Sequence, residues 1–203
     1  MQRQLVITED GSHTIAIPES NITYHSMHGA IQESMHVFIE AGFKFRTEMP
    51  DKPDQLNVLE FGFGTGLNAL LTLIESIKTR QHIHYTAIES FPLTIEESGQ
   101  LNYCALLHRM DLQSVFDKMH SCDWEKHEVI TSSFELFKTK SPVPELKSNN
   151  LFDIIYFDAF DPATQPELWT SEIFSDLYKM MSNNGVFVTY SSKGDVRRAL
   201  KAD

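Results

Sequence analysis

Three glycines at alternate positions, Gly62, Gly64 and Gly66, stand between Glu60 and Asn68. Glycine adopts positive φ at little cost and has no Cβ to hold a ligand away from the backbone. A short apolar stretch precedes these glycines and a helical pattern follows them. The segment therefore predicts the first strand-to-helix turn of an open α/β sheet, where ligands bind.

The glycine spacing indicates the kind of ligand. A dinucleotide fingerprint would place its third small residue at position 67, which is Leu67. The pattern acid-x-Gly-x-Gly-x-Gly instead resembles the loop that holds S-adenosylmethionine (SAM) in class I methyltransferases. SAM carries no pyrophosphate, so such a loop needs no phosphate cradle. We expect the acid, the three glycines and the asparagine to bind SAM.

A second acidic residue, Glu89, follows the glycines at a spacing that indicates a ligand contact. Glu89 ends an apolar stretch at residues 84–88 and lies 23 residues after Gly66. In nucleotide-type folds an acid about 20 residues beyond the glycine loop accepts hydrogen bonds from ribose hydroxyls. We therefore predict that Glu89 binds the ribose of SAM.

A third group of candidate residues follows the apolar stretch at residues 152–157. Asp158 ends that stretch, which places it at the same sheet edge as the glycine loop if both strands are parallel. Phe160, Pro162 and Trp169 come next and are expected to form an apolar wall for a substrate. Packing of the loop on a helix is an equally good interpretation for Trp169.

Metal and disulfide chemistry have little support. His25 with His28, and His82 with His84, form pairs that lack a third ligand at zinc spacing. The two cysteines form no Cys-x-x-Cys motif and are too few for a disulfide framework. We expect no metal, and a reducing cytosol.

The elements that must position these residues alternate between strand and helix. Apolar strands are expected at 56–61, 84–88, 127–131, 152–157 and 186–190. Helical patterns are expected at 67–77, 94–120 (broken), 171–181 and 195–202. Apolar strands separated by helices predict a parallel sheet covered on both faces. The expected class is a doubly wound, Rossmann-like α/β fold.

The first 53 residues have a different character. Stretches at 4–8 and 13–17 predict a hairpin, and apolar residues at helical spacing predict a helix over 28–41 with Gly42 as its C-cap. We therefore expect a small extension at 1–53, built of a hairpin and a helix, and a SAM-binding domain at 54–203.

The charge balance limits the partners. The chain of 203 residues has 17 Lys and Arg against 28 Asp and Glu, a net charge of −11, which disfavours non-specific binding to nucleic acid or anionic membranes. No signal peptide or apolar span is evident, so we expect a soluble cytoplasmic protein. Basic residues are nevertheless unevenly placed: four lie near the end of the chain, and two more flank the N-terminal segment. They predict local patches for weak, salt-sensitive binding to an RNA loop, at Lys193, Arg197, Arg198 and Lys201, and at Lys44 and Arg46.

Taken in order, four segments resemble the methyltransferase domain of MnmC-type tRNA modification enzymes. They are GFGTGLNAL (62–70), IESFPLT (88–94), DAFDP with PELW (158–169) and YSSKGDVRRAL (190–200). The upstream YHS and ESMHVFI, between 24 and 39, resemble that family's N-terminal segment. The resemblance implies methyl transfer from SAM to the amine of 5-aminomethyl-2-thiouridine at the wobble position of the tRNA anticodon loop.

The resemblance also implies roles for single residues. Asp158 is expected to orient the amine and accept its proton, and Ser133 stands where such folds contact adenine. In these 203 residues we expect no flavin-dependent oxidase domain like that of the bifunctional enzymes. We therefore expect a stand-alone methyltransferase with no flavin and no obligatory protein partner, ending one terminal hairpin short of its family.

Two other functions stay open. An aminopropyltransferase has the same fold and a similar loop after the fourth strand, and transfers from decarboxylated SAM to a cationic polyamine, which suits an acidic protein. A module that binds SAM or RNA without turnover is the other alternative.

Overall fold

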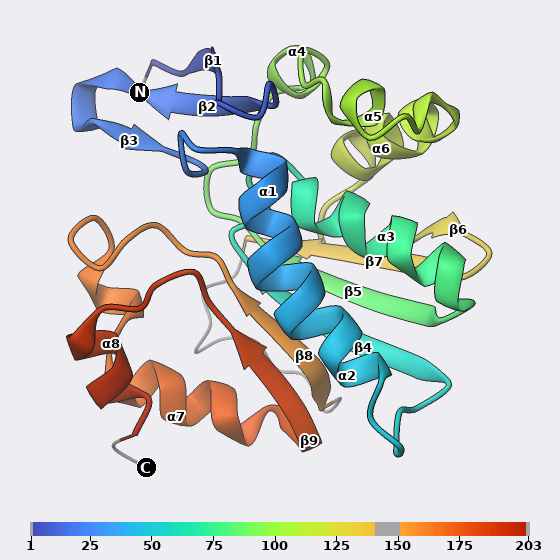
Figure 1. Ribbon diagram of the computed structural model, residues 1–203, viewed down its shortest axis with the longest axis vertical. Coiled ribbons are helices and arrows are strands. Elements are labelled where there is room, and N and C mark those ends of the chain that lie inside the picture. Colours follow the sequence, from blue (N-terminus) through green and yellow to red (C-terminus); the bar gives the residue numbers. More distant parts are fainter. Residues whose placement is uncertain (1, 141–150, 202–203) are drawn as a thin grey trace.

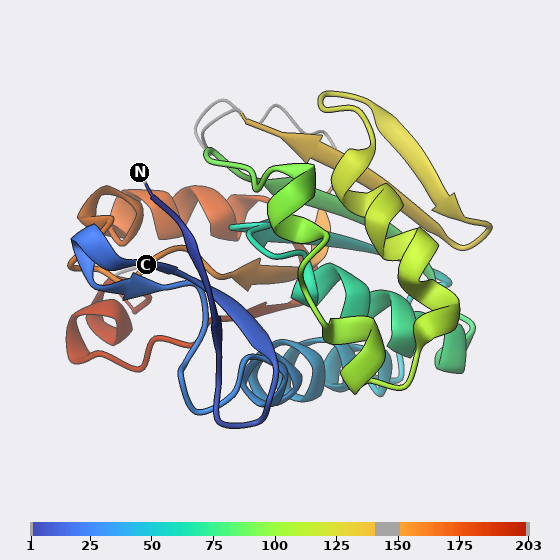
Figure 2. The same ribbon diagram turned by 90° about the horizontal axis from the view of Figure 1, so that it is seen from above.

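A computed structural model describes residues 2–140 and 151–201, and shows a six-stranded sheet between two layers of helices (Figures 1 and 2). Its strands are β4 (Gln55–Phe61), β5 (His82–Ile88), β6 (His127–Thr131), β7 (Phe134–Thr139), β8 (Phe152–Phe157) and β9 (Met181–Val188). They lie in the order β6-β7-β5-β4-β8-β9. All neighbours pair in parallel except β6 with β7. The predicted doubly wound α/β fold is confirmed.

The strand order reverses between β4 and β8, which are direct neighbours although far apart in sequence. Such a reversal opens a crevice at the carboxyl ends of the strands. All six residues of β8 are buried, as expected for a central strand covered by helices on both faces.

The third parallel strand differs from its prediction. Residues 127–131 form β6, which runs antiparallel at the sheet edge, and the strand that pairs with β5 is β7. A tight turn joins the two, so β6 and β7 form a hairpin that the alternating pattern does not reveal. The predicted third strand is therefore wrong in its role.

The helix over 28–41 is longer than predicted. It runs through α1 (Ala30–Ser34), a π-helical segment η2 (Met35–Lys44) and α2 (Phe45–Thr47). Gly42 is buried within it and is not a C-cap. A Cβ there would meet the Tyr156 ring at 3.0 Å and Val188 at 3.1 Å, so the glycine lets the helix lie against the sheet.

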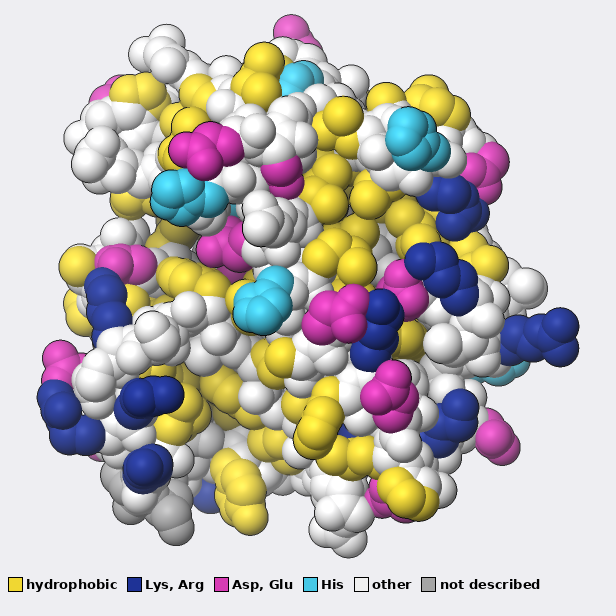
Figure 3. Space-filling view, in the orientation of Figure 1, with side chains coloured by type: hydrophobic (Ala, Val, Ile, Leu, Met, Phe, Trp, Pro, Cys, Tyr) yellow, Lys and Arg dark blue, Asp and Glu magenta, His cyan; other side chains and the backbone are white. Residues whose placement is uncertain are grey.

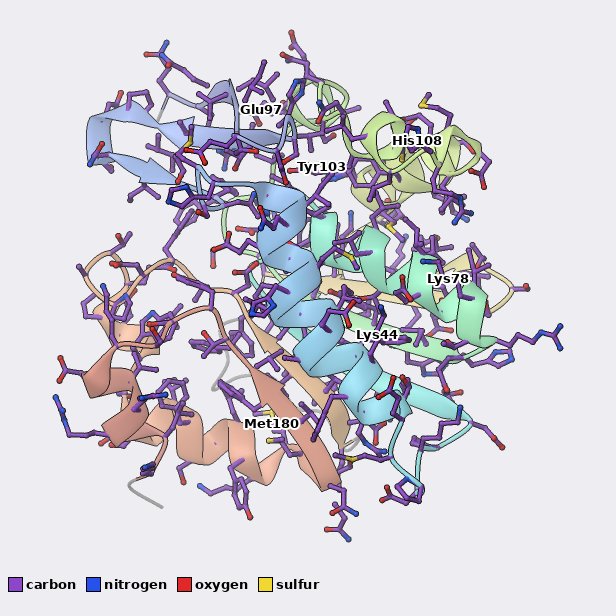
Figure 4. The ribbon with its side chains drawn as sticks, in the orientation of Figure 1. Lys44, Lys78, Glu97, Tyr103, His108 and Met180 are labelled. Carbon is purple, nitrogen blue, oxygen red and sulfur yellow. The ribbon has the colours of Figure 1, made fainter. Side chains whose placement is uncertain are left out.

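The predicted hairpin has a third strand. β1 (Gln4–Ile7), β2 (His13–Ile17) and β3 (Ile22–Thr23) form a small antiparallel sheet. Two side chains labelled in Figure 4 attach it to the rest of the protein. The Tyr103 hydroxyl donates a 2.7 Å hydrogen bond to the His13 carbonyl, and Glu97 pairs with Arg3 at 3.1 Å.

The remaining α-helices agree with the predicted pattern within a few residues. The first layer holds α3 (Leu67–Thr79), α4 (Ile95–Ser98), α5 (Tyr103–Leu106), η3 (Met110–Leu112) and α6 (Gln113–Ser121). The opposite face carries η5 (Pro166–Leu168), α7 (Ser171–Lys179) and α8 (Gly194–Ala199). A short 3-10 helix, η1 (Pro18–Ser20), precedes β3, and neither it nor η5 was predicted. Residue 202 of the predicted last helix lies outside the described residues.

Each face of the sheet has its own hydrophobic cluster. Phe38 and Phe43 of the N-terminal helix belong to the same cluster as Val58 and Leu70 of the predicted SAM domain. The opposite cluster joins Phe157 to residues of α7. The division at residue 54 stays a prediction, because the two parts share a core.

Within 2–140 and 151–201, no helix has the length and apolarity to cross a membrane.

Candidate active site

The glycine loop lies between β4 and α3, at the carboxyl edge of the sheet. Gly62, Gly64 and Gly66 have φ angles of +86°, +49° and +72°, which side chains rarely adopt. The loop folds back toward β5, where the amide of Gly62 donates a 2.9 Å hydrogen bond to the Ile88 carbonyl. The alternate glycines are therefore needed for the backbone shape of this turn.

Gly62 also fixes the position of Asp158. A Cβ at Gly62 would lie 2.6 Å from the Asp158 carbonyl oxygen, and the Asp158 amide donates a 3.0 Å bond to the Phe61 carbonyl. The glycine loop and the aspartate therefore meet at the point where the strand order reverses, as their places in the sequence predict.

Glu89 lies directly beside the glycine loop. One carboxylate oxygen accepts the Gly64 amide at 2.9 Å and the other accepts the Phe91 amide at 2.7 Å. The acid therefore joins the first strand-to-helix turn to the loop after β5. Its side chain also lines the cleft described below, and its contact with a ribose stays a prediction.

A half-buried histidine, His120, packs against the glycine loop. His120 of α6 has its Nε2 3.1 Å from the Thr65 carbonyl, and a Cβ on Gly66 would lie 2.9 Å from that nitrogen. Burial lowers the pKa of His120 to about 4, so the ring is neutral near pH 7 and donates through Nε2. A residue of α6 therefore supports the loop that joins β4 to α3.

Two buried polar side chains, those of Asn68 and Glu60, interact with Asp158. Its Oδ2 accepts a 2.9 Å hydrogen bond from Asn68, and fully buried Glu60 lies close enough for its charge to act on the aspartate. Burial raises the pKa of Asp158 well above its usual value; the charges of Glu60 and Glu33 add to this, while the Asn68 bond opposes it. Burial likewise raises the pKa of Glu60 to about 8. Asp158 is therefore a stronger proton acceptor than an exposed carboxylate.

Two clefts adjoin at this edge of the sheet. The first has about 820 Å³ of empty space and is lined by parts of 61–68, 88–91 and 158–168. The second has about 870 Å³ and is lined by 20–26 with Glu33, Asp158, Asp161 and Tyr190. Both are lined by Tyr24, His25, Asp158, Ala159 and Phe160.

An aromatic pair stands where the clefts meet. The Tyr24 and Phe160 rings contact each other edge to face, with their centroids 5.2 Å apart. Tyr24 also packs on the glycine loop, since a Cβ on Gly64 would lie 3.1 Å from its ring. Asp158 is thus in the wall shared by a glycine-lined cleft and an acidic one.

Three predicted site residues lie elsewhere. Ser133 is in the β6–β7 turn, and its carbonyl accepts the amide of Ile83 near the start of β5, at the opposite sheet edge from Glu89. It cannot contact a ligand on the glycine loop. The prediction placed it after the third parallel strand, but that strand is β7, which begins after Ser133.

Trp169 and Pro162 do not line either cleft in the part of the chain that the structure describes. Trp169 is 7% exposed and packs edge to face on Phe157. Its indole Nε1 donates a 2.8 Å hydrogen bond to the Phe160 carbonyl. These contacts favour the packing interpretation of Trp169, and Phe160 is the member of the predicted wall that lines the described clefts.

Several site residues, among them Tyr24, His25 and Glu33, were not predicted from the sequence. All three come from the N-terminal segment: Tyr24 and His25 line both clefts, and Glu33 lines the second. Their only signal was the family-like YHS and ESMHVFI segments. Burial lowers the pKa of His25 to about 4, so it is a neutral hydrogen-bonding residue, with its Nδ1 2.9 Å from the Thr14 hydroxyl.

Among the described residues, no group of three or more His, Cys, Asp or Glu side chains has the arrangement of a metal site. The clefts are lined by glycine backbone, carboxylates and aromatic rings. Such groups can hold a nucleoside-like ligand in the first cleft and a cationic group in the second.

Basic side chains lie outside the acidic cleft. Figure 3 shows dark blue side chains gathered over the region of α8. Lys193, Arg197, Arg198 and Lys201 are exposed there, and Lys193 pairs with Asp161 of the second cleft. The predicted basic group near the end of the chain is therefore exposed beside the site, although Arg198 also pairs with Asp195. Arg46 of the N-terminal group is buried, so the prediction of a surface patch there is wrong for this residue.

Comparisons with known proteins agree with the geometry. A family model described as S-adenosyl-L-methionine-dependent methyltransferase matches residues 114–203. The tRNA 5-methylaminomethyl-2-thiouridine biosynthesis bifunctional protein MnmC of Paraburkholderia xenovorans (strain LB400) is 28% identical over 194 residues, which cover 87% of this chain and 28% of that protein. The MnmC protein of Aromatoleum aromaticum (strain DSM 19018 / LMG 30748 / EbN1) is 28% identical over 210 residues, covering 98% of this chain and 32% of the relative. The chain thus spans less than a third of these relatives.

One solved structure shares the fold over almost the whole chain. The crystal structure of MnmC2 from Aquifex aeolicus matches with a TM-score of 0.74 and 24% sequence identity, covering 99% of this chain and 64% of that one. This match shows the fold of a SAM-dependent methyltransferase, and the sequence relatives support the resemblance to the MnmC-type methyltransferase domain.

Proposed function

We propose that this MnmC-type methyltransferase domain is a SAM-dependent N-methyltransferase that converts 5-aminomethyl-2-thiouridine to 5-methylaminomethyl-2-thiouridine at the tRNA wobble position. The observation that carries the proposal is the place of Asp158. It stands in the wall between the glycine-lined cleft and the acidic cleft, where a donor on one side and an amine on the other would meet.

The first cleft fits SAM. Glycines at positive φ leave the loop backbone without side chains against this cleft, and the Glu89 carboxylate lines it, where we propose that it also accepts hydrogen bonds from the ribose hydroxyls. Apolar side chains such as Phe63 and Phe91 line the same cleft. SAM supplies an already activated methyl group, so the protein's main tasks are alignment and exclusion of water.

Asp158 supplies the proton chemistry. A protonated amine has no lone pair, so one N–H proton must leave before the nitrogen bonds to the methyl carbon. Asn68 donates a hydrogen bond to Oδ2 of Asp158. The other oxygen, Oδ1, has no hydrogen-bond partner among the described residues. This oxygen takes the proton. The nitrogen lone pair then forms the N–C bond as the C–S bond breaks and its electrons remain on sulfur.

The second cleft would receive the wobble base. Taking a base from a single-stranded anticodon loop costs less than unstacking a duplex. The basic patch on α8 borders this cleft and would contact the RNA backbone, which reconciles tRNA binding with a net charge of −11. We also propose that the protein works in the cytoplasm, with tRNA as its partner.

The test is a methyl-transfer assay with labelled SAM and tRNA that carries the aminomethyl group. Methylation of that tRNA, with 5-methylaminomethyl-2-thiouridine found by nucleoside mass spectrometry, supports the proposal. Decarboxylated SAM with putrescine is the second arm, because an acidic cleft also suits a polyamine. Transfer in that arm alone would replace the proposal by the aminopropyltransferase function, and SAM binding without transfer in either arm would indicate a binding module.

A further inference from the structure

We infer that Glu33 is a specificity-determining residue for the methyl acceptor: its carboxylate holds the acceptor as a cationic ammonium opposite Asp158. The inference rests on the proposed function and goes beyond it, because it assigns a separate residue to recognition of the charged amine.

Glu33 comes from a different part of the fold than the proton acceptor. It lies on α1, whereas Asp158 follows β8, and both line the second cleft. Its Oε2 accepts a 2.7 Å hydrogen bond from the Ser26 amide, which fixes the side chain across the turn before α1. The cleft is therefore bounded by two carboxylates on separate elements.

The charges of the cleft leave Glu33 available for a ligand. Of the three acids that line it, Asp161 pairs with Lys193 and Asp158 accepts from Asn68. Within 2–140 and 151–201, no basic side chain lies within ion-pair distance of Glu33. Burial raises its pKa, and its charge acts on Asp158. A cation bound between two neighbouring carboxylates offsets the repulsion between their negative charges.

The two carboxylates would have different roles: Asp158 accepts a proton from the ammonium group, and Glu33 binds that group. A primary alkylammonium offers three N–H donors, of which one goes to Asp158 and is lost as a proton. A second donor directed to Glu33 would hold the nitrogen during that transfer, and the rings of Tyr24 and Tyr190 in the same cleft also favour a cation. A neutral group in the same place would leave a partly buried carboxylate unpaired, so the cleft discriminates against it.

The test compares a charged and a neutral acceptor. Two anticodon stem-loop RNAs, one with a 5-aminomethyl and one with a 5-hydroxymethyl wobble uridine, are titrated into the protein saturated with S-adenosylhomocysteine, so no turnover occurs. Glu33→Gln removes the charge but keeps an oxygen to accept the Ser26 amide. Glu33→Asp keeps the charge, and Glu40→Gln, an exposed change on the same helical run, is the matched control.

We expect the wild type to bind the aminomethyl RNA at least about tenfold tighter than the hydroxymethyl RNA, the size of one charge-assisted hydrogen bond. Glu33→Gln should reduce that ratio about fivefold or more, with unchanged affinity for SAM, while Glu33→Asp and Glu40→Gln keep it. An unchanged ratio in a folded Glu33→Gln protein overturns the inference. Should Glu33→Gln not fold, loss of the ratio in Glu33→Asp, which keeps the charge, would also overturn it. If the wild type does not methylate the aminomethyl RNA, the proposed function fails first, which distinguishes the two failures.

Discussion

The side-chain amide of Asn68 donates a 2.9 Å hydrogen bond to Oδ2 of Asp158, across 90 positions of sequence. Asn68 is in the first turn of α3 and Asp158 follows β8, so the bond spans the point where the strand order reverses. It fixes which carboxylate oxygen faces the ligand. The first turn of α3, which directly follows the glycine loop, thereby orients the proton acceptor.

Replacing Asp158 by Asn should separate binding from turnover. The amide keeps the size and polarity of the side chain but cannot accept the ammonium proton. We expect SAM affinity within about threefold of the wild type and kcat lower by about 100-fold or more, a common effect of removing a general base. Calorimetry with SAM and a single-turnover methylation assay measure the two quantities. Near wild-type turnover would refute the role of Asp158.

Replacing Asn68 by Ala should move the pH dependence of turnover. The Asn68 bond favours the charged form of Asp158 and lowers its pKa, so its loss raises that pKa further. Turnover requires the basic form of Asp158, and the rising limb of the kcat profile should therefore shift to higher pH. A profile that stays in place or shifts to lower pH would show that Asn68 does not tune the aspartate.

Gly62→Ala and Gly11→Ala make a matched pair. Both glycines have similar φ, +86° and +83°, but a Cβ on Gly62 lies 2.6 Å from the Asp158 carbonyl oxygen, whereas nothing lies within 4 Å of one on Gly11. Conformational strain alone predicts a loss of about 1 kcal/mol for Gly11→Ala. With the added overlap, we expect about 3 kcal/mol or more and loss of SAM binding for Gly62→Ala. Equal losses in urea unfolding would contradict the close approach.

Glu60→Gln should change how stability depends on pH. Burial raises the pKa of Glu60 from 4.5 to about 8, so the unfolded chain ionises first and wild-type stability falls as pH rises through that window. Between about pH 5 and 8, the unfolding free energy of the wild type should fall relative to Glu60→Gln by about 1.4 kcal/mol per pH unit. Urea unfolding at several pH values measures the difference, and a constant difference would show that Glu60 is ionised in the folded protein.

Phe160→Ala and Trp169→Phe should affect different properties. Phe160 lines both clefts, so its loss should raise KM for the acceptor RNA about tenfold with little change in thermal stability. Trp169 is buried and holds the Phe160 carbonyl from behind, so Trp169→Phe should lower the melting temperature and change KM less. Acceptor titrations and calorimetric melting distinguish the two. The reverse pattern would restore Trp169 as a substrate contact.

The sequence predicted the parts of the site that follow from local pattern. Gly62 and Glu89 could be placed because an apolar strand followed by glycines or an acid has one usual geometry. Ser133 could not, since the short β6–β7 hairpin breaks the strand-helix alternation on which its placement depended. Gly42 resembled a helix end, because only the packed sheet shows that Tyr156 and Val188 need the missing side chain. Glu33 lies far from the motif in sequence, and only the tertiary fold brings it to Asp158.

The order of the strands in the sheet has a consequence for how the site forms during synthesis. The ribosome makes the N-terminal sheet and the glycine loop first, whereas β8 occupies the place beside β4 only much later. Until then the flank of β4 has no neighbour and the loop has no aspartate beside Gly62. Because residues after β8 line both clefts, neither the donor cleft nor the acceptor cleft is complete until β8 has paired with β4.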